Sequence, residues 1–282
     1  MSLVELEESG PQDAQTAWPG LLRVQPRSIL ALTVAALGLA WLAVSLIDVA
    51  GLIDISGDVP LWLSLFNEGI VEVVQWILNA LAVVAAGYIA GRLAGGRYAG
   101  GASFFFVLSI GLALILIEEA GNVRLALAEY LGAMFGGEIL GMHPHVVGAA
   151  PVYAVLAFFP VYALLRYGKY VWRAPTARWY LVLTYCLYAG SQLAALTSHL
   201  AGVWYAKAGN AVNELIFGGG LPPLPNVSQG VTDYFIVDSL VEETIELLAV
   251  ATMLAMILAY IHDVRRGAVP VPRSPDRDQA ST

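Results

Sequence analysis

The segment YFIVDSLVEETIELLAVATMLAMILAYI, residues 234–261, decides how the rest of the chain must fold. A helix needs about 20 mostly apolar residues to cross a bilayer, and this segment meets that requirement. Its first half nevertheless contains Asp238, Glu242, Glu243 and Glu246. The spacing of four between Asp238, Glu242 and Glu246 places these three acids on one helix face. Because a carboxylate in contact with lipid is costly, this face is predicted to look into the protein and to be functional.

The composition of the whole chain is typical of a membrane protein with several spans. Of its 282 residues, 58% are hydrophobic and 13% are charged, and the mean hydropathy is +0.70. The hydrophobic fraction and the mean hydropathy exceed what a soluble domain of this length carries, and the charged fraction is below it. The single cysteine, Cys186, excludes a disulfide framework or a thiolate metal cluster within the chain. No basic patch interleaved with aromatic residues is present, so nucleic-acid binding is not expected.

Six segments have the length and composition of spanning helices, so the sequence predicts an all-α bundle of six transmembrane helices. They cover residues 29–53, 68–94, 102–120, 146–167, 180–199 and 234–261. Residues 125–135 are too short and too amphipathic to span, and are predicted to form an outer helix at the membrane surface. The membrane domain is thus expected over residues 29–261. Polar tails are expected on the cytoplasmic side over residues 1–28 and 262–282, the second of them disordered.

The distribution of charge predicts the orientation. With the N-terminus in the cytoplasm and six spans, every Lys and Arg except Arg124 and Lys207 lies on the cytoplasmic side. This is the side that Lys and Arg prefer in membrane proteins. Most of the 22 acids, and three of the four histidines, lie in outer loops or in the outer halves of helices. We therefore predict a protein of the cell membrane with both termini cytoplasmic and an acidic site on the extracytoplasmic side.

Three further segments are predicted to present polar side chains at the same depth as the acids of residues 234–261. In the first and the last of these segments, the spacing of three, four or seven residues keeps the polar positions near one helix face, and the middle segment ends in an adjacent pair of acids. They are, in chain order, Glu68, Glu72, Gln75 and Asn79; Glu118 and Glu119; and Tyr185, Tyr188, Gln192 and His199. Four helices are thus expected to enclose one polar chamber.

Several carboxylates in a medium of low dielectric constant need a positive partner, and our first hypothesis is that one or two divalent metal ions supply it. Carboxylate and imidazole ligands from antiparallel helices form the di-iron and di-manganese sites of helical bundles, and such ligands also suit zinc. The chain departs from that pattern because it contains no Glu-x-x-His. The predicted ligands are Glu72, Glu118, Glu119, His199, Glu242, Glu243 and Glu246.

Other polar residues are predicted to orient these ligands or to form a pathway to them. They are Glu68, Gln75, Asn79, Tyr188, Gln192 and Asp238, with His143 and His145 from an outer loop. Iron, zinc and manganese are equally compatible with this set. An enzyme built on such a site would oxidise or hydrolyse a lipid-soluble or periplasmic small molecule.

Two other hypotheses stay open at this point. The same acids could carry protons or cations in a transporter or channel, since intramembrane carboxylates mark such pathways. No internal repeat with paired broken helices accompanies them, although many transporters have one. Alternatively, the acids form a surface for packing or for a partner protein, in a structural subunit of a membrane assembly.

Overall fold

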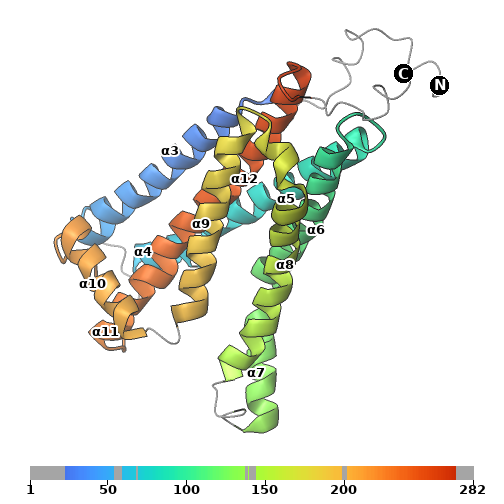
Figure 1. Ribbon diagram of the computed structural model, residues 1–282. Helices are drawn as coiled ribbons and strands as arrows, with labels where there is room; N and C mark the ends of the chain where they lie inside the picture. The colour runs from blue at the N-terminus through green and yellow to red at the C-terminus, as the bar shows by residue number, and fades with distance from the viewer. Residues whose placement is uncertain are drawn as a thin grey trace, which may run out of the picture.

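The computed structural model describes residues 23–53, 59–67, 69–136, 139, 144–198 and 202–270, with the backbone alone for 144, 145 and 196–198. Within these residues the chain is a helical bundle, as the sequence predicts (Figure 1). In this described part, five helical segments are long and apolar enough to cross a membrane. They are Pro26–Val49, Leu61–Leu93, Ala99–Gly121, Val146–Trp172 and Gln229–Arg265. The chain therefore has the features of a multi-pass membrane protein.

The helices follow one another with short connections. In chain order they are α3 (Pro26–Val44), the π-helical turn η2 (Ser45–Val49), α4 (Leu61–Phe66), α5 (Ile70–Leu93), α6 (Ala99–Gly121), α7 (Val123–Phe135), α8 (Pro144–Trp172), α9 (Ala177–Ser198), α10 (Gly202–Phe217), α11 (Gln229–Phe235), the π-helical turn η3 (Ile236–Val241) and α12 (Glu242–Arg265).

The predicted span over residues 180–199 corresponds to α9, which is 22 residues long but is not among the five apolar segments. Its Thr, Ser and Gln residues lower its hydropathy relative to the other long helices. A sixth crossing therefore stays a prediction. A helix covers the predicted residues 125–135 as α7, which packs against α8, and its place at the outer membrane surface stays a prediction. The sequence reasoning did not predict α4, α10 or α11.

The last helix, α12, lies at the centre of the bundle. In the most apolar 18-residue stretch of Gln229–Arg265, 83% of the residues are buried inside the protein, against 17% for Pro26–Val49. α12 packs against α9, α5 and α3, and α5 leads on to α6, α8 and α7 (Figure 1). Glu242 and Glu246 are buried as well, so these two acids face neighbouring helices rather than lipid.

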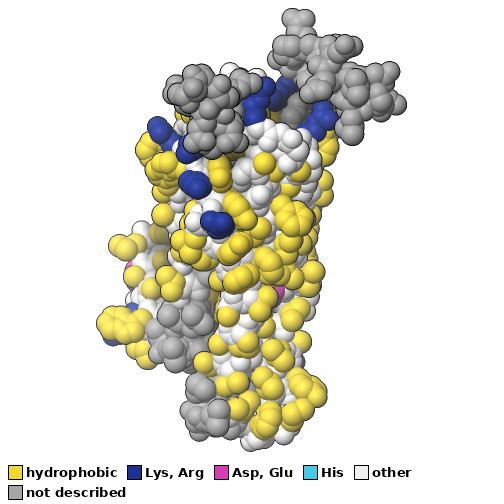
Figure 2. Space-filling model, turned by 45° about the vertical axis from the view of Figure 1, so that its right-hand side comes forward, with side chains coloured by type: hydrophobic (Ala, Val, Ile, Leu, Met, Phe, Trp, Pro, Cys, Tyr) yellow, Lys and Arg dark blue, Asp and Glu magenta, His cyan; other side chains and the backbone are white. Residues whose placement is uncertain are grey.

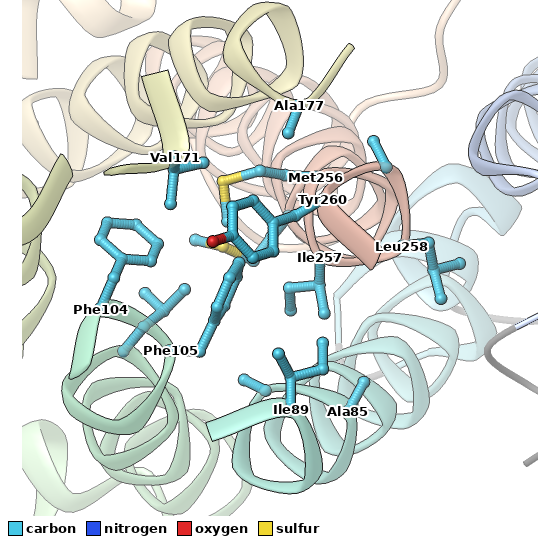
Figure 3. Close-up of a cluster of buried hydrophobic side chains, with 14 of the residues drawn as sticks. Ala85, Ile89, Phe104, Phe105, Val171, Ala177, Met256, Ile257, Leu258 and Tyr260 are labelled. Carbon is cyan, nitrogen blue, oxygen red and sulfur yellow. The ribbon is translucent and has the colours of Figure 1, made fainter. Parts of the chain in front are cut away.

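Large apolar side chains fill the half of α12 that follows its acids. Figure 3 shows Ile257 and Tyr260 of α12 pointing toward Ile89 of α5 and Phe105 of α6. The rings of Phe105 and Tyr260 lie with their centroids 4.9 Å apart. Gly101 allows α6 to approach this closely, because a Cβ at that position would collide with the Tyr260 hydroxyl. This close packing fixes the position of α12 against α5 and α6.

The basic side chains mark one end of the bundle. Figure 2 shows Lys and Arg gathered at one end of the visible face, above an apolar surface. The helix termini that meet at this end include the last turns of α5 and α12, with Arg92 and Arg265. At the same end, Asp263 of α12 accepts hydrogen bonds from the backbone N–H groups of Thr176 (2.8 Å) and Ala177 (3.2 Å). A carboxylate in this position satisfies the otherwise unpaired N–H groups at the start of α9.

Candidate functional site

Glu246 is the point at which three helices meet through polar side chains. Its carboxylate accepts hydrogen bonds from Ser191 Oγ of α9 at 2.6 Å and from Gln75 Nε2 of α5 at 3.0 Å. Gln192 Nε2 of α9 donates a third, longer bond at 3.5 Å. Ser191, Gln75 and Glu246 are all buried. These hydrogen bonds from α5 and α9 hold the Glu246 side chain in place.

Glu119 and Glu243 lie close enough to interact with Glu246, and Glu72 lies close enough to interact with both of them. The Gln75 amide also donates to Glu119 Oε2 of α6, at 3.5 Å. Glu119 interacts electrostatically with Glu246 and with Glu72 of α5, and Glu243 interacts with all three. We call Glu72, Glu119, Glu243 and Glu246 the carboxylate cluster. Like charges at short range in a medium of low dielectric constant repel strongly, so this arrangement requires bound protons or a bound cation.

Arg124 is the basic side chain nearest to these acids, and it pairs with Glu118 rather than with the cluster. Its Nε lies 3.4 Å from Glu118 Oε1, and its guanidinium also contacts the hydroxyl and the ring of Tyr153. Asn122 makes this pairing possible, because its left-handed backbone conformation (φ 46°) turns the chain between α6 and α7. Glu119 and Glu242 receive only longer-range stabilisation from Arg124.

Several buried oxygen atoms at this site lack a hydrogen-bond partner among the described residues. They are Gln75 Oε1, Asn79 Oδ1, Glu243 Oε2 and the Tyr188 hydroxyl. Gln75 and Asn79 are only 3% and 2% exposed. The two hydrogen bonds that Gln75 donates fix the orientation of its amide, so its carbonyl oxygen is the unpaired atom. Leaving a buried polar atom unpaired costs about 1–3 kcal/mol, and such atoms usually mark a bound ion, water or proton.

Asp238 and Glu242 form a second acidic pair at the start of the same helix. The Tyr205 hydroxyl of α10 donates to Glu242 Oε2 at 3.4 Å, and the Tyr205 ring lies 5.3 Å from that of Tyr234. Burial, followed by the negative charge of Glu242, raises the pKa of the Tyr205 hydroxyl. Tyr205 therefore keeps its proton at neutral pH and acts as a hydrogen-bond donor to Glu242.

The π-helical turn η3 contains Asp238 and leads directly into Glu242. Turns of this type are rare and occur frequently at functional sites, because the wider turn changes which side chains face a neighbour. Here it separates the short helix α11 from α12 at the level of the acids. The π-helical turn therefore lies at the same place in the chain as Asp238 and Glu242.

The structure brings most of the described candidate residues together. Glu72, Gln75, Glu119, Gln192, Glu243 and Glu246 belong to one network. Asn79 is buried on the same helix as Gln75, and Tyr188 interacts electrostatically with Glu119 and Glu246. Glu118 instead pairs with Arg124, and Asp238 lies with Glu242 near Tyr205. Glu68, His143 and His199 lie outside the described residues, as does the side chain of His145.

Two contributors to the site were not predicted from the sequence. Ser191 makes the shortest hydrogen bond to Glu246, and its position three residues after Tyr188 on the same helix was an available signal. Tyr205 lies on α10, which contains too many polar residues to be recognised from the sequence as an apolar helix. No pattern in the sequence connects α10 with the start of α12, so tertiary structure alone reveals this contact.

A preformed metal site is not found in the described part of the chain. No group of three or more His, Cys, Asp or Glu side chains in residues 23–53, 59–67, 69–136, 144–198 and 202–270 is arranged to hold a metal ion. The carboxylate oxygens of the site therefore lie near one another but do not surround a single position that a metal ion could occupy. In comparisons with known proteins, no family model, no curated protein and no solved structure matches the chain.

Proposed function

We propose that this protein is an integral membrane protein that binds a cation at the carboxylate cluster. The observation that carries the proposal is the meeting of four glutamates from α5, α6 and α12 around buried amide oxygens that have no described partner. Arg124 is engaged by Glu118, so the cluster needs another source of positive charge. A cation supplies that charge and also occupies the unpaired oxygens of Gln75 and Asn79.

Our first candidate for the cation is a divalent metal ion. Carboxylate and amide oxygens are the donors that hard cations such as Mn²⁺, Mg²⁺ and Ca²⁺ prefer. Binding requires the side chains of Glu72, Glu119 and Glu243 to close around the ion, because the described side chains form no ready-made metal site. An imidazole ligand would come from His199, which follows the end of α9 in the sequence. Such a ligand would shift the preference toward zinc or iron.

The second candidate is a proton, bound in a proton- or cation-coupled transporter. The observation that favours it is a series of hydrogen-bonded groups that runs from Gln192 through Glu246 and Gln75 to Glu119. A protonated glutamate becomes a hydrogen-bond donor, and the unpaired oxygens of Gln75 and Asn79 are suitable acceptors. Chains of this kind are typical of proton relays in membrane proteins.

The orientation in the membrane is part of the proposal. We propose that α9 is a sixth span and that the basic end of the bundle is cytoplasmic, which puts the carboxylate cluster in the outer half of the membrane. A helix of 22 residues is about 33 Å long, which suffices to cross a bilayer. The gathering of Lys and Arg at one end supports this orientation (Figure 2).

Cysteine labelling tests the orientation. The exposed Cys186 is first replaced by Ser, and single cysteines are then introduced at Pro222 and Arg173. A membrane-impermeant maleimide is expected to label position 222 in intact cells and position 173 only in inverted vesicles. The reverse pattern would place the acidic site at the cytoplasmic face.

Two measurements on purified protein separate the two cations. Elemental analysis is expected to find metal bound to the wild type and lost in Glu246→Gln, while the matched variant Glu129→Gln, at an exposed position on α7, retains it. The other informative result is a wild type that contains no metal and shows pH-driven ion flux in liposomes, with the flux lost in Glu246→Gln. That result would favour a bound proton as the cation. If neither metal nor flux is found, the acids serve packing alone and the proposal is wrong.

A further inference from the structure

The exposed face of α8 changes from apolar to basic along the helix. Phe158, Tyr162 and Leu165 come first, with exposed fractions of 57%, 41% and 82%. Lys169 follows on the same helix and Arg173 comes directly after its last residue, and both are exposed. The five positions are spaced by three or four residues, so they share one side of the helix. We call these five residues the α8 stripe.

The two basic residues of the α8 stripe share one aromatic ring. Lys169 Nζ lies 5.2 Å from the centroid of the Tyr170 ring, and Arg173 Cζ lies 5.9 Å from it. The ring is held in place by α6, because it packs so closely against Gly100 that a Cβ at that position would collide with it. Both cations are attracted to the ring, so two positive charges are kept near one another at a fixed place.

These two charges are not compensated by an acid. Among the described residues, no Asp or Glu forms an ion pair with Lys169 or Arg173. Asp263, an acid at the same end of the bundle, instead accepts hydrogen bonds from the backbone N–H groups of Thr176 and Ala177. Like charges four residues apart repel one another, so Lys169 and Arg173 favour an anion that contacts both. A phosphate group suits this position, because it accepts strong hydrogen bonds from Lys and Arg side chains.

The apolar part of the α8 stripe has the length of one lipid leaflet. α8 belongs to a segment with the properties of a spanning helix, and only 17% of the most apolar stretch of that segment is buried inside the protein. The axial distance from Lys169 to Phe158 is about 16 Å, close to half the thickness of the hydrocarbon core. Figure 2 shows Lys and Arg at one end extending onto an apolar surface. An acyl chain along Tyr162 and Leu165 would therefore place its polar head at the two cations.

We propose that the α8 stripe binds a phospholipid with a net negative charge, such as phosphatidylglycerol, with its phosphate between Lys169 and Arg173 and an acyl chain along Leu165. Arg166 is exposed beside the stripe, and its positive charge disfavours a headgroup that carries an ammonium group, such as that of phosphatidylcholine. Basic groups next to a membrane attract anionic lipids in this way. The inference goes beyond the cation site and does not depend on it.

Native mass spectrometry of the purified full-length protein, titrated in detergent micelles with dioleoylphosphatidylglycerol or dioleoylphosphatidylcholine, tests the proposal. The wild type is expected to bind the anionic lipid at least about fivefold more tightly than the zwitterionic one. The double variant Lys169→Gln/Arg173→Gln is expected to weaken binding of the anionic lipid about tenfold or more, because each basic group contributes to the attraction. Lys207→Gln is the matched control. Lys207 is exposed on α10 and lies 4.7 Å from the Trp204 ring, outside the stripe, so this variant is expected to bind as the wild type does.

Competition identifies the source of the phosphate. Glycerol 1-phosphate offers a phosphate without acyl chains, and at equal concentration it is expected to leave the lipid bound. Arg173→Lys keeps the positive charge and is expected to retain lipid binding, and size-exclusion chromatography verifies that each variant is folded. Displacement of the lipid by glycerol 1-phosphate would overturn the proposal, because the basic residues would then form a general anion site. Equal affinity of the wild type for the two lipids, or unchanged binding of the anionic lipid in the double variant, would overturn it as well.

Discussion

The two halves of α12 have opposite surroundings although they belong to one continuous helix. From about Met253 to Ile261 the helix packs mainly against apolar side chains, as around Ile257 and Tyr260. Around Glu242 and Glu246 the neighbours are instead Ser191, amides and other carboxylates. The apolar half determines where the helix lies, and the acidic half holds charge at the position so determined.

The apolar half of α12 therefore contributes mainly to stability, and the acidic half contributes mainly to binding. Packed apolar groups gain dispersion energy from every neighbour, and they lose it when a single group is removed. Carboxylates brought together within a membrane are destabilising unless a partner compensates them, so a protein retains them for what they bind. Substitutions in the two halves are therefore expected to have opposite consequences for stability and for binding.

The largest loss of stability is expected from Ile257→Ala in the apolar half. Ile257 is fully buried, and removal of its side chain leaves a cavity against α5 and α6. The cost is expected to be about 2–5 kcal/mol, with cation binding intact in the molecules that remain folded. Thermal unfolding in detergent measures this, with Leu165→Ala at an exposed position as the control. Equal melting temperatures for the two variants would contradict the packing described for α12.

A smaller loss is expected from Glu246→Ala, and none from Glu246→Gln. The alanine leaves the donors of Ser191 and Gln75 unpaired, at a cost of about 1–3 kcal/mol. The glutamine keeps one acceptor oxygen for Gln75, offers an amide N–H that the Ser191 hydroxyl can accept, and removes one repelling charge. The same unfolding measurement should therefore place Glu246→Gln at or above the wild type and Glu246→Ala below it. If the two variants are equally unstable, the negative charge itself stabilises the fold and the account of the cluster is wrong.

The smallest effect is expected at the edge of the acidic half, from Tyr205→Phe. Loss of the hydrogen bond to Glu242 should cost about 0.5–1.5 kcal/mol at neutral pH. The pKa of Tyr205 is raised in the folded protein above its ordinary value of 10.0, so the folded state holds this proton more tightly than the unfolded state. The stability that it contributes is complete below pH 10 and is lost as the pH rises further.

Unfolding followed from pH 8 to pH 11 checks this dependence. The wild type is expected to lose stability more steeply above pH 10 than Tyr205→Phe, which has no hydroxyl to titrate at that position. Parallel curves for the two proteins would show that Tyr205 is not the group responsible.

The sequence predicts the helical membrane fold and the grouping of acids well, because both follow from local patterns. Apolar runs identify five of the described segments as spans, and the spacing of Glu72, Gln75 and Asn79 places these residues on one face of a helix. The interpretation of residues 234–261 is also supported, since Glu242 and Glu246 are buried against protein.

The remaining features depend on contacts between distant segments, which no local pattern encodes. The pairing of Arg124 with Glu118 requires the left-handed turn at Asn122, and the contact of Tyr205 with Glu242 requires α10 to fold back on α12. The central position of α12 is likewise a tertiary property, because an apolar sequence suits a lipid-facing helix and a buried one equally well.

A titration with Mn²⁺ tests most directly whether the acidic half of α12 binds a divalent cation. Free Mn²⁺ has a strong electron paramagnetic resonance signal that is lost on binding, so the titration counts bound ions per chain. The wild type is expected to bind one or two ions, Ile257→Val to bind as many, and Glu246→Gln to bind at least about tenfold more weakly. Absence of binding by the wild type, or equal binding by Glu246→Gln, would contradict the assignment of a divalent metal ion to the carboxylate cluster.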